Sequence, residues 1–125
     1  MVLENAKILI GDDSILARKQ LKDYISALGC TNFIEAVNGQ EVIDKYLSEK
    51  PDIVFLDIVM PVKDGICAVQ EICKADPNAC VIMVSSVGTV QQLKAAIEAG
   101  AKDFVQKPFS DNQIAAVLDA HLGGN

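Results

Sequence analysis

Apolar residues along the chain follow two alternating patterns. Five short runs rich in β-branched side chains have the length of strands and cover residues 7–10, 33–37, 53–56, 81–84 and 103–106. Between these runs the apolar spacing changes to three and four residues, which is the period of an amphipathic helix. The helical sets are Leu21, Tyr24, Ile25 and Leu28; Val42, Ile43, Tyr46 and Leu47; Ile66, Val69, Ile72 and Cys73; Val90, Leu93 and Ile97, with Gly100 as a stop; and Ile114, Val117 and Leu118.

This alternation predicts an α/β fold of (βα)5 type, because parallel strands need crossovers, and the helices then cover both faces of a parallel sheet. A strand covered on both faces is continuously apolar, whereas an edge strand can carry polar residues. The first, third and fourth runs are the apolar ones, while the second contains Glu35 and the short fifth has Asp103 and Gln106 at its ends. We therefore predict strand order 2-1-3-4-5, with a crevice at the carboxyl ends of strands one and three.

Length and composition are those of one globular domain, expected to cover residues 1–125. Half of the 125 residues are hydrophobic and 22% are charged. The net charge is −6, and Lys and Arg form no cluster, which argues against direct nucleic-acid binding. Apolar runs are too short to span a bilayer, and Met1 begins no signal-peptide pattern, so we expect a cytoplasmic protein without membrane insertion.

The cysteines and the histidine suggest no chemistry of their own. Cys30, Cys67, Cys73 and Cys80 form no C-x-x-C pair and lie within or beside apolar segments, so we expect buried, reduced thiols. The only histidine, His121, lies near the C-terminal end. A zinc site is therefore not expected, and His121 is interpreted as a surface or helix-end residue.

Polar side chains follow four of the predicted strands. Strand one runs into Asp12 and Asp13, strand three into Asp57, strand four ends at Ser85, and strand five leads into Lys107. Crowded carboxylates need a cation to offset their repulsion, and Mg²⁺, with Mn²⁺ as a substitute, prefers such oxygen ligands and binds phosphate oxygens. Each residue alone has a structural explanation as a helix cap or a solvated side chain. Together, at one edge of a sheet, they predict phosphoryl chemistry.

The same residues fall in segments that resemble the response-regulator receiver domain of the CheY type. The matching segments span nearly the whole chain: residues 10–14 (IGDDS), 57–65 (DIVMPVKDG), Ser85 and 100–109 (GAKDFVQKPF). The family has the flavodoxin-like strand order 2-1-3-4-5, in agreement with the predicted fold. The resemblance implies a phosphoacceptor switch of two-component or chemotaxis signalling, not an enzyme that turns over an external substrate.

The resemblance also implies a role for each site residue. Asp57 is the nucleophile, which takes a phosphoryl group from a sensor histidine kinase or from a small donor such as acetyl phosphate. Asp13, Asp57 and the backbone carbonyl of Val59 bind Mg²⁺ directly, whereas Asp12 acts mainly through a metal-bound water. Lys107 pairs with the phosphoryl oxygens, and the peptide bond that follows it, to a proline, is expected to be cis.

The expected switch couples the site to a distant surface. By resemblance, Ser85 shifts towards the phosphoryl group and Phe104 turns inwards, which alters the surface of helix four, strand five and helix five where a downstream protein binds. Phe104 has an equally good explanation as an ordinary core residue of strand five. A separate phosphatase is a further expected partner, and the chain is expected to be a monomer or a weak, phosphorylation-dependent dimer.

Several positions depart from the commonest pattern of the family. Ser85 replaces a frequent Thr, Ser86 stands where Ala is common, and Gly11 stands where Val is common, but no required functional group is lost. Val59 and Val87 stand where polar residues in some relatives orient the water that hydrolyses the acyl phosphate, and valine cannot hydrogen-bond that water. We therefore hypothesise slow self-dephosphorylation unless a phosphatase supplies the missing polar group.

Three other functions stay open at this point. A Mg²⁺-dependent phosphohydrolase would also use Asp57, although no D-x-D-x-T motif follows it. A flavodoxin would share the layers, but Asp12 and Asp13 would repel the phosphate of FMN. A phosphorylation-independent interaction module of receiver-like shape would normally lack an acidic or basic site residue, and none is missing. With helix five ending near His121, the chain resembles a stand-alone chemotaxis-type receiver, and a receiver cut from a longer regulator would have the same pattern.

Overall fold

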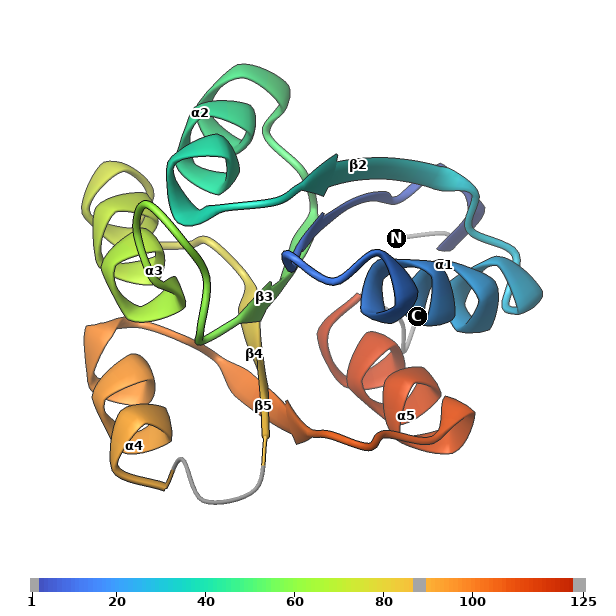
Figure 1. Ribbon diagram of the computed structural model, residues 1–125. Helices are drawn as coiled ribbons and strands as arrows, with labels where there is room; N and C mark the ends of the chain where they lie inside the picture. Colours follow the sequence, from blue (N-terminus) through green and yellow to red (C-terminus); the bar gives the residue numbers. More distant parts are fainter. Residues whose placement is uncertain (1–2, 87–89, 123–125) are drawn as a thin grey trace.

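The computed structural model describes residues 3–86 and 90–122, which form three layers (Figure 1). Within these residues the central layer is a parallel sheet of five strands in the order β2-β1-β3-β4-β5. The strands are β1 (Lys7–Gly11), β2 (Asn32–Ala36), β3 (Ile53–Asp57), β4 (Val81–Ser85) and β5 (Asp103–Gln106). The helices are η1 (Leu3–Asn5, a 3-10 turn), α1 (Ile15–Ala27), α2 (Gly39–Glu49), α3 (Gly65–Ala75), α4 (Val90–Ala99) and α5 (Asp111–His121). The predicted fold class and strand order are confirmed.

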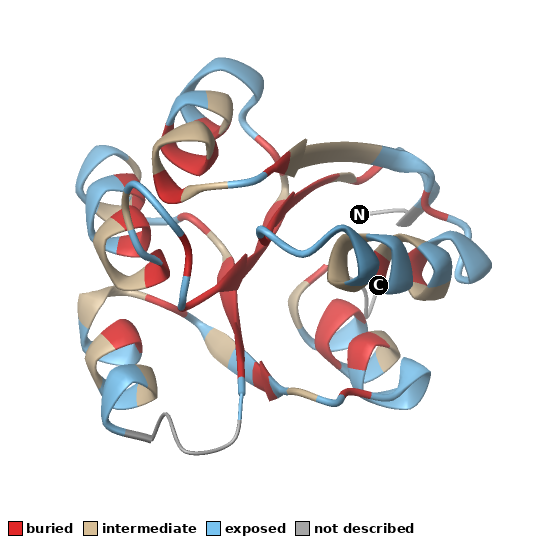
Figure 2. Cartoon of the chain, viewed as in Figure 1, coloured by how far each residue is buried: buried red, intermediate tan, exposed pale blue. Residues whose placement is uncertain are grey.

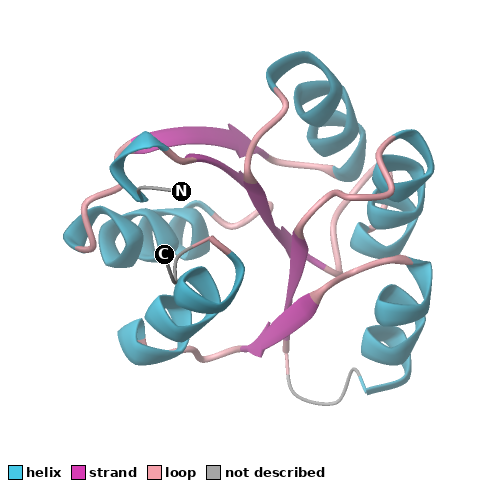
Figure 3. Ribbon diagram, turned by 180° about the vertical axis from the view of Figure 1, so that it is seen from behind, coloured by secondary structure: helices cyan, strands magenta, loops and turns pink. Residues whose placement is uncertain are grey.

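Helices cover both faces of the sheet. Helices α1 and α5 pack together on one face, and α2, α3 and α4 line the other, as the front and back views show (Figures 1 and 3). Each face buries its own apolar core: Leu56 and Met83 point to the α2–α3–α4 side, and Phe55 and Ile82 point to the α1–α5 side. Strands β3 and β4 are consequently buried at every position (Figure 2). The buried sheet therefore fixes the positions of the residues at the ends of its strands.

Three strands extend one residue further than their apolar pattern predicts. Gly11, Asp57 and Ser85 are the last residues of β1, β3 and β4. The parallel register pairs Gly11 with Leu56 and Asp57 with Val84, so the strands end at the same edge of the sheet. Asp57 and Ser85 therefore lie on strand backbone, and Asp12 follows β1 directly.

Most helices begin at a side-chain cap, which explains where the strand-to-helix connections end. Ser14 accepts a hydrogen bond from the backbone N–H of Ala17 at α1, and Asn38 and Asp64 cap α2 and α3 in the same way. Gly100 follows α4 with a φ of +126°, a left-handed conformation that favours glycine, as expected for its predicted role as a stop. Among the described residues, no helix combines the length and apolar character that crossing a membrane requires.

The expectation of buried cysteines is correct only for Cys30. All four cysteines are free, but Cys67, Cys73 and Cys80 are half-buried. Cys67 lies near the start of α3 with its Sγ 3.6 Å from Glu71 Oε2, at the protein surface. Apolar neighbours in sequence were an insufficient guide, because Cys73 and Cys80 lie at the margins of the cores and Cys67 lies at the surface.

His121 is a helix-end residue, as predicted. It is the last residue of α5, and its Nε2 lies 3.0 Å from Asp103 Oδ2, which joins the end of α5 to the start of β5.

Candidate metal centre

Three carboxylates converge at the carboxyl edge of the sheet. Asp12 and Asp13 directly follow β1, Asp57 ends β3, and one oxygen from each lies within 4.8 Å of the others. Asp12 is 2% exposed and Asp57 is 8% exposed, whereas Asp13 faces solvent. The predicted convergence is confirmed, and among the described residues no other group of three His, Cys, Asp or Glu side chains comes this close.

Lys107 completes the cluster from the loop after β5. Its Nζ lies 2.9 Å from Asp12 Oδ2 and 3.4 Å from Asp57 Oδ2. The backbone N–H of Lys107 donates to the carbonyl of Ser85 at 2.6 Å, which holds this loop against the end of β4. The Lys107–Pro108 peptide bond is cis, the isomer that the resemblance implied.

The charges of the cluster perturb one another. Burial raises the pKa of Asp57, and the charge of Asp12 raises it further, while Lys107 and the backbone N–H of Val59 oppose this rise without cancelling it. Burial alone would lower the pKa of Lys107, but its contacts with Asp12 and Asp57 outweigh burial and raise that pKa. Lys107 therefore stays cationic beside the carboxylates.

The donor set fits a hard divalent cation. Three carboxylates lie together and only one ammonium group contacts them, so a cation would offset their mutual repulsion. Carboxylate oxygens on a partly open edge suit Mg²⁺, which retains several waters and uses few protein ligands. The residues present are thus able to hold the ion that the sequence predicted.

Two glycines hold the loop between β3 and α3 against the site. Gly65 donates its N–H to the carbonyl of Ile58 at 2.7 Å, and a Cβ on Gly65 would lie 2.1 Å from the carbonyl oxygen of Asp57. Gly39 donates to the carbonyl of Lys63 at 3.0 Å, and its Cβ would lie 2.1 Å from that same oxygen. The loop is therefore fixed from two sides, through contacts that leave no room for a side chain.

The other predicted residues lie as follows. Ser85 is 4% exposed at the end of β4, and the side chain of Val59 is 63% exposed in the loop after Asp57. Phe104 is 47% exposed on the edge strand β5, so its interpretation as an ordinary core residue is wrong. Val87 lies outside the described residues.

The sequence pattern did not predict one contact of the site. Arg18, in α1, donates from Nη1 to the backbone carbonyl of Asp12 at 2.6 Å. Its partner is a main-chain atom, so no residue type in the sequence marks the pair. The only available signal was an arginine one turn into the helix that follows the acidic pair.

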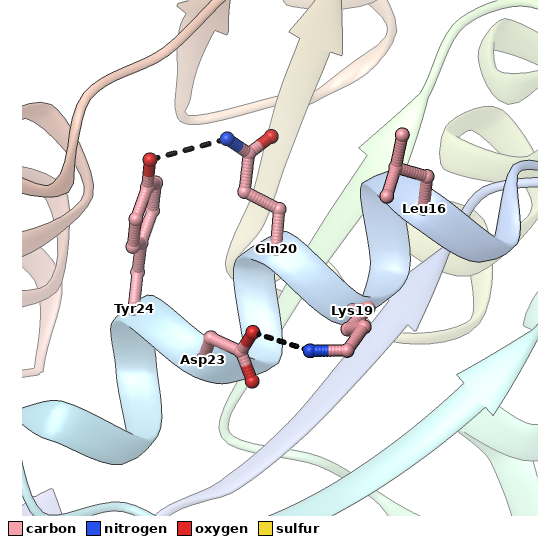
Figure 4. Close-up of a pocket in the computed structure, with 5 residues that line it drawn as sticks. All are labelled: Leu16, Lys19, Gln20, Asp23 and Tyr24. Atoms are coloured by element: carbon pink, nitrogen blue, oxygen red, sulfur yellow. Dashed lines mark hydrogen bonds and ion pairs between the residues drawn. The ribbon is translucent and has the colours of Figure 1, made fainter.

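Side chains of α1 also line a pocket. Its lining residues are Leu16, Lys19, Gln20, Asp23 and Tyr24 (Figure 4). Lys19 pairs with Asp23 at 2.9 Å, and Gln20 Nε2 donates to the Tyr24 hydroxyl at 3.1 Å. These polar groups satisfy one another along one helix face, so the carboxylate cluster is the better candidate for chemistry.

Residues 8–119 match the response regulator receiver domain family, and the chain belongs to this family of signalling proteins. The chemotaxis protein CheY of Thermotoga maritima is 45% identical over 113 residues, which are 90% of this chain and 94% of that protein.

Solved structures agree with this assignment. CheY in the CheX-CheY-BeF3-Mg²⁺ complex from Borrelia burgdorferi superposes with a TM-score of 0.86 at 37% identity, covering 92% of this chain and 87% of that one. NtrX from Brucella abortus superposes with a TM-score of 0.86 at 30% identity, but the match covers 94% of this chain and only 26% of that longer one. The chain is thus a CheY-type receiver domain by fold and by sequence.

Proposed function

We propose that this chain is a phosphoacceptor switch in which Asp57 takes a phosphoryl group from a sensor histidine kinase or a small donor such as acetyl phosphate. The observation that carries this proposal is the convergence of Asp12, Asp13 and Asp57, with Lys107 bridging two of them. A structural explanation by helix capping does not account for it, because the N-cap of α1 is Ser14.

Each residue has a chemical role in the proposed transfer. A carboxylate oxygen of Asp57 forms a bond to phosphorus as the donor's bond to phosphorus breaks, and that bond's electron pair leaves with the donor. Lys107 offsets negative charge on the peripheral phosphoryl oxygens, where it accumulates in a loose transition state. Asp12, Asp13, Asp57 and the backbone carbonyl of Val59 would hold Mg²⁺ or Mn²⁺. The bound ion supplies further charge compensation for the phosphoryl oxygens.

The proposed output is a change of the surface formed by α4, β5 and α5. Ser85 would move towards the phosphoryl group, and Phe104 would turn inwards from its 47% exposed position. Ile97 of α4 is also a large apolar side chain on the surface, 42% exposed. Exposed apolar groups on neighbouring elements are the kind of surface that a protein target covers. A downstream protein is therefore the proposed reader of this face.

A kinase has to contact the surface around Asp57. Large apolar side chains are exposed in the segments that follow Asp13 and Asp57: Ile15 and Leu16, each 75% exposed, Val59, 63% exposed, and Val62, 78% exposed. The Borrelia CheY complex with CheX and Mg²⁺ supports both a divalent cation and a further protein partner. We propose that a separate phosphatase is among the partners, and that the chain is a monomer or a weak dimer that depends on phosphorylation.

The proposed transfer is tested by intact-mass measurement after incubation with acetyl phosphate, with and without Mg²⁺. We expect one phosphoryl adduct that requires Mg²⁺ and is absent from Asp57→Asn. The adduct should decay slowly once the donor is removed, because Val59 offers no hydrogen bond to a hydrolytic water.

Other outcomes, of this experiment and of two related measurements, would favour a different site or function. Equal labelling of native protein and Asp57→Asn would place the acceptor elsewhere. No labelling by acetyl phosphate or by a phosphorylated kinase would favour an interaction module, and continuous release of phosphate from a free phosphomonoester would favour a phosphohydrolase.

A further inference from the structure

We infer that Arg18 is a positioning residue for the metal-binding carboxylates and that Glu35 holds it in place; this inference rests on the proposed function. Arg18 belongs to α1 and is not one of the groups that touch metal or phosphate in that proposal. Its Nη1 lies 2.6 Å from the backbone oxygen of Asp12, and its Nε lies 2.9 Å from Glu35 Oε1. The Arg18 side chain is 11% exposed and Asp12 is 2% exposed, so the contact with Asp12 is largely shielded from solvent, whereas the Glu35 side chain is 38% exposed.

The carbonyl that Arg18 holds belongs to the peptide group between Asp12 and Asp13. Fixing this group restricts the ψ angle of Asp12 and the φ angle of Asp13, because the peptide is planar. These two angles set how the Cα–Cβ bonds of Asp12 and Asp13 are directed relative to each other, and with them the positions from which both carboxylates extend. Arg18 therefore acts on two proposed metal ligands through one main-chain contact.

Asp12 is held at each of its polar atoms. Its N–H donates to the carbonyl of Ala36 at 3.1 Å, its Oδ1 accepts from the N–H of Ser14 at 2.9 Å, and its Oδ2 accepts from Lys107 at 2.9 Å. Arg18 supplies the partner for the remaining atom, the carbonyl oxygen. Because Asp12 is 2% exposed, loss of Arg18 would leave this buried oxygen without that partner and favour rotation of the peptide.

Arg18 is itself held rigidly. A guanidinium group is planar and presents its donors in a fixed fork, so a bond from Nε to Glu35 sets the direction of Nη1. Glu35 forms a second ion pair, with Lys22, at 3.0 Å. The hydrogen bond from Lys22, together with that from Arg18, lowers the pKa of Glu35 despite its burial, so this carboxylate stays charged. A lysine at position 18 would carry the charge but could not keep both contacts in a fixed plane.

The inference is tested by binding of Mn²⁺ to the full chain without phosphodonor, measured by electron paramagnetic resonance of free Mn²⁺. The variants are Arg18→Met, Arg18→Lys and Glu35→Gln. Lys19→Met is the matched control: it removes the same charge from the next residue of α1, but Lys19 pairs with Asp23 on the outward face (Figure 4). Partners that orient metal ligands typically change affinity by about 10- to 100-fold, so we expect Arg18→Met to raise Kd by about tenfold.

The remaining variants show whether a loss of metal affinity comes from misplaced carboxylates, from the lost positive charge or from a damaged fold. Arg18→Lys and Glu35→Gln should raise Kd by smaller factors, and Lys19→Met should leave it unchanged. A urea unfolding curve without metal, recorded for each variant, shows whether the fold is intact; if Arg18→Met does not fold, Arg18→Lys and Glu35→Gln decide the question.

Two results would overturn the inference alone: native-like Kd values in the folded Arg18 and Glu35 variants, or an equal loss of affinity in Lys19→Met. Absence of Mn²⁺ binding by the native chain would instead overturn the proposed function, and this inference with it.

Discussion

At the scale of single residues, the side chain of Val42 fills the volume beside Gly11 at the end of β1. A Cβ on Gly11 would lie 2.5 Å from Val42 Cγ2 and 3.0 Å from Leu56 Cδ1. Val42 is fully buried and β-branched, so it has little freedom to move away. Receiver domains commonly carry valine where this chain has Gly11. The structure explains the departure, because Val42 fills the volume that such a side chain would need.

We expect Gly11→Ala to lower the free energy of unfolding by about 1–3 kcal/mol, the usual cost of overpacking a core. Urea unfolding of the metal-free chain measures this change. Combining Gly11→Ala with Val42→Ala should cost less than the sum of the two single changes, because the second substitution makes room for the first. Strict additivity of the two changes would show that the two side chains do not compete.

Burial of individual side chains was the least predictable feature of the sequence. Apolar periodicity identified Ile25, Val69 and Val117 correctly as buried, but Leu47 belongs to the same kind of pattern and is 50% exposed. A pattern shows which side of a helix faces inward, and it does not show how far the neighbouring helix extends over that side. The exposure of Phe104 on its edge strand has the same origin.

At the scale of elements, α1 and the edge strand β2 are joined by the ion pairs of Glu35 with Arg18 and Lys22. The pKa of Glu35 lies below its ordinary value of 4.5, chiefly through the hydrogen bond from Lys22 and with a further contribution from Arg18. A depressed carboxyl pKa stabilises the fold above the ordinary pKa, and this stability is lost as pH falls through the lowered value.

We therefore expect the free energy of unfolding at neutral pH to be higher for the native protein than for Glu35→Gln. The difference should be at most about 1 kcal/mol, because Glu35 is partly exposed. The difference should shrink below about pH 4 and with added salt. Urea unfolding of both proteins from pH 7 to pH 3 measures it. A difference that stays constant over this range would mean that the ion pairs of Glu35 contribute nothing to stability.

The elements themselves were largely predictable from sequence. Periodicity located all five strands, and the polar Glu35 and Asp103 correctly marked the edge strands. Boundaries were less certain: β2 begins at Asn32 and ends at Ala36, one residue earlier than its apolar run suggests. The carboxylate cluster followed from strand order alone. The Arg18 contact could not follow, because it depends on the backbone path of the loop after β1, which no side-chain pattern encodes.

At the scale of the whole molecule, the carboxylate cluster and the proposed output face share β4 and β5. Ser85 ends β4, and β5 carries Phe104 and leads to Lys107, so a change at the cluster has a short covalent route to that face. A switch of this kind needs an element with two arrangements, and the exposed ring of Phe104 is the candidate for it.

The chain contains no tryptophan, so Phe104→Trp introduces a single tryptophan, on β5, whose fluorescence can be excited selectively. We expect its emission to shift to the blue and its quenching by acrylamide to weaken after phosphorylation with acetyl phosphate and Mg²⁺, because the ring turns inwards. The same substitution combined with Asp57→Asn should show neither change. Unchanged emission in a sample that carries the phosphoryl adduct by mass would exclude residue 104 as the moving element.

The two close approaches at Gly39 and Gly65 also bear on how mutational scans of this protein should be interpreted. At each position a backbone oxygen of another segment lies too close to leave room for a Cβ atom. A library selected only for folded, soluble expression would already reject every other amino acid there. Intolerance at these two positions would consequently carry no information about the proposed function, unlike intolerance at Asp13, whose exposed carboxylate belongs to the candidate metal centre.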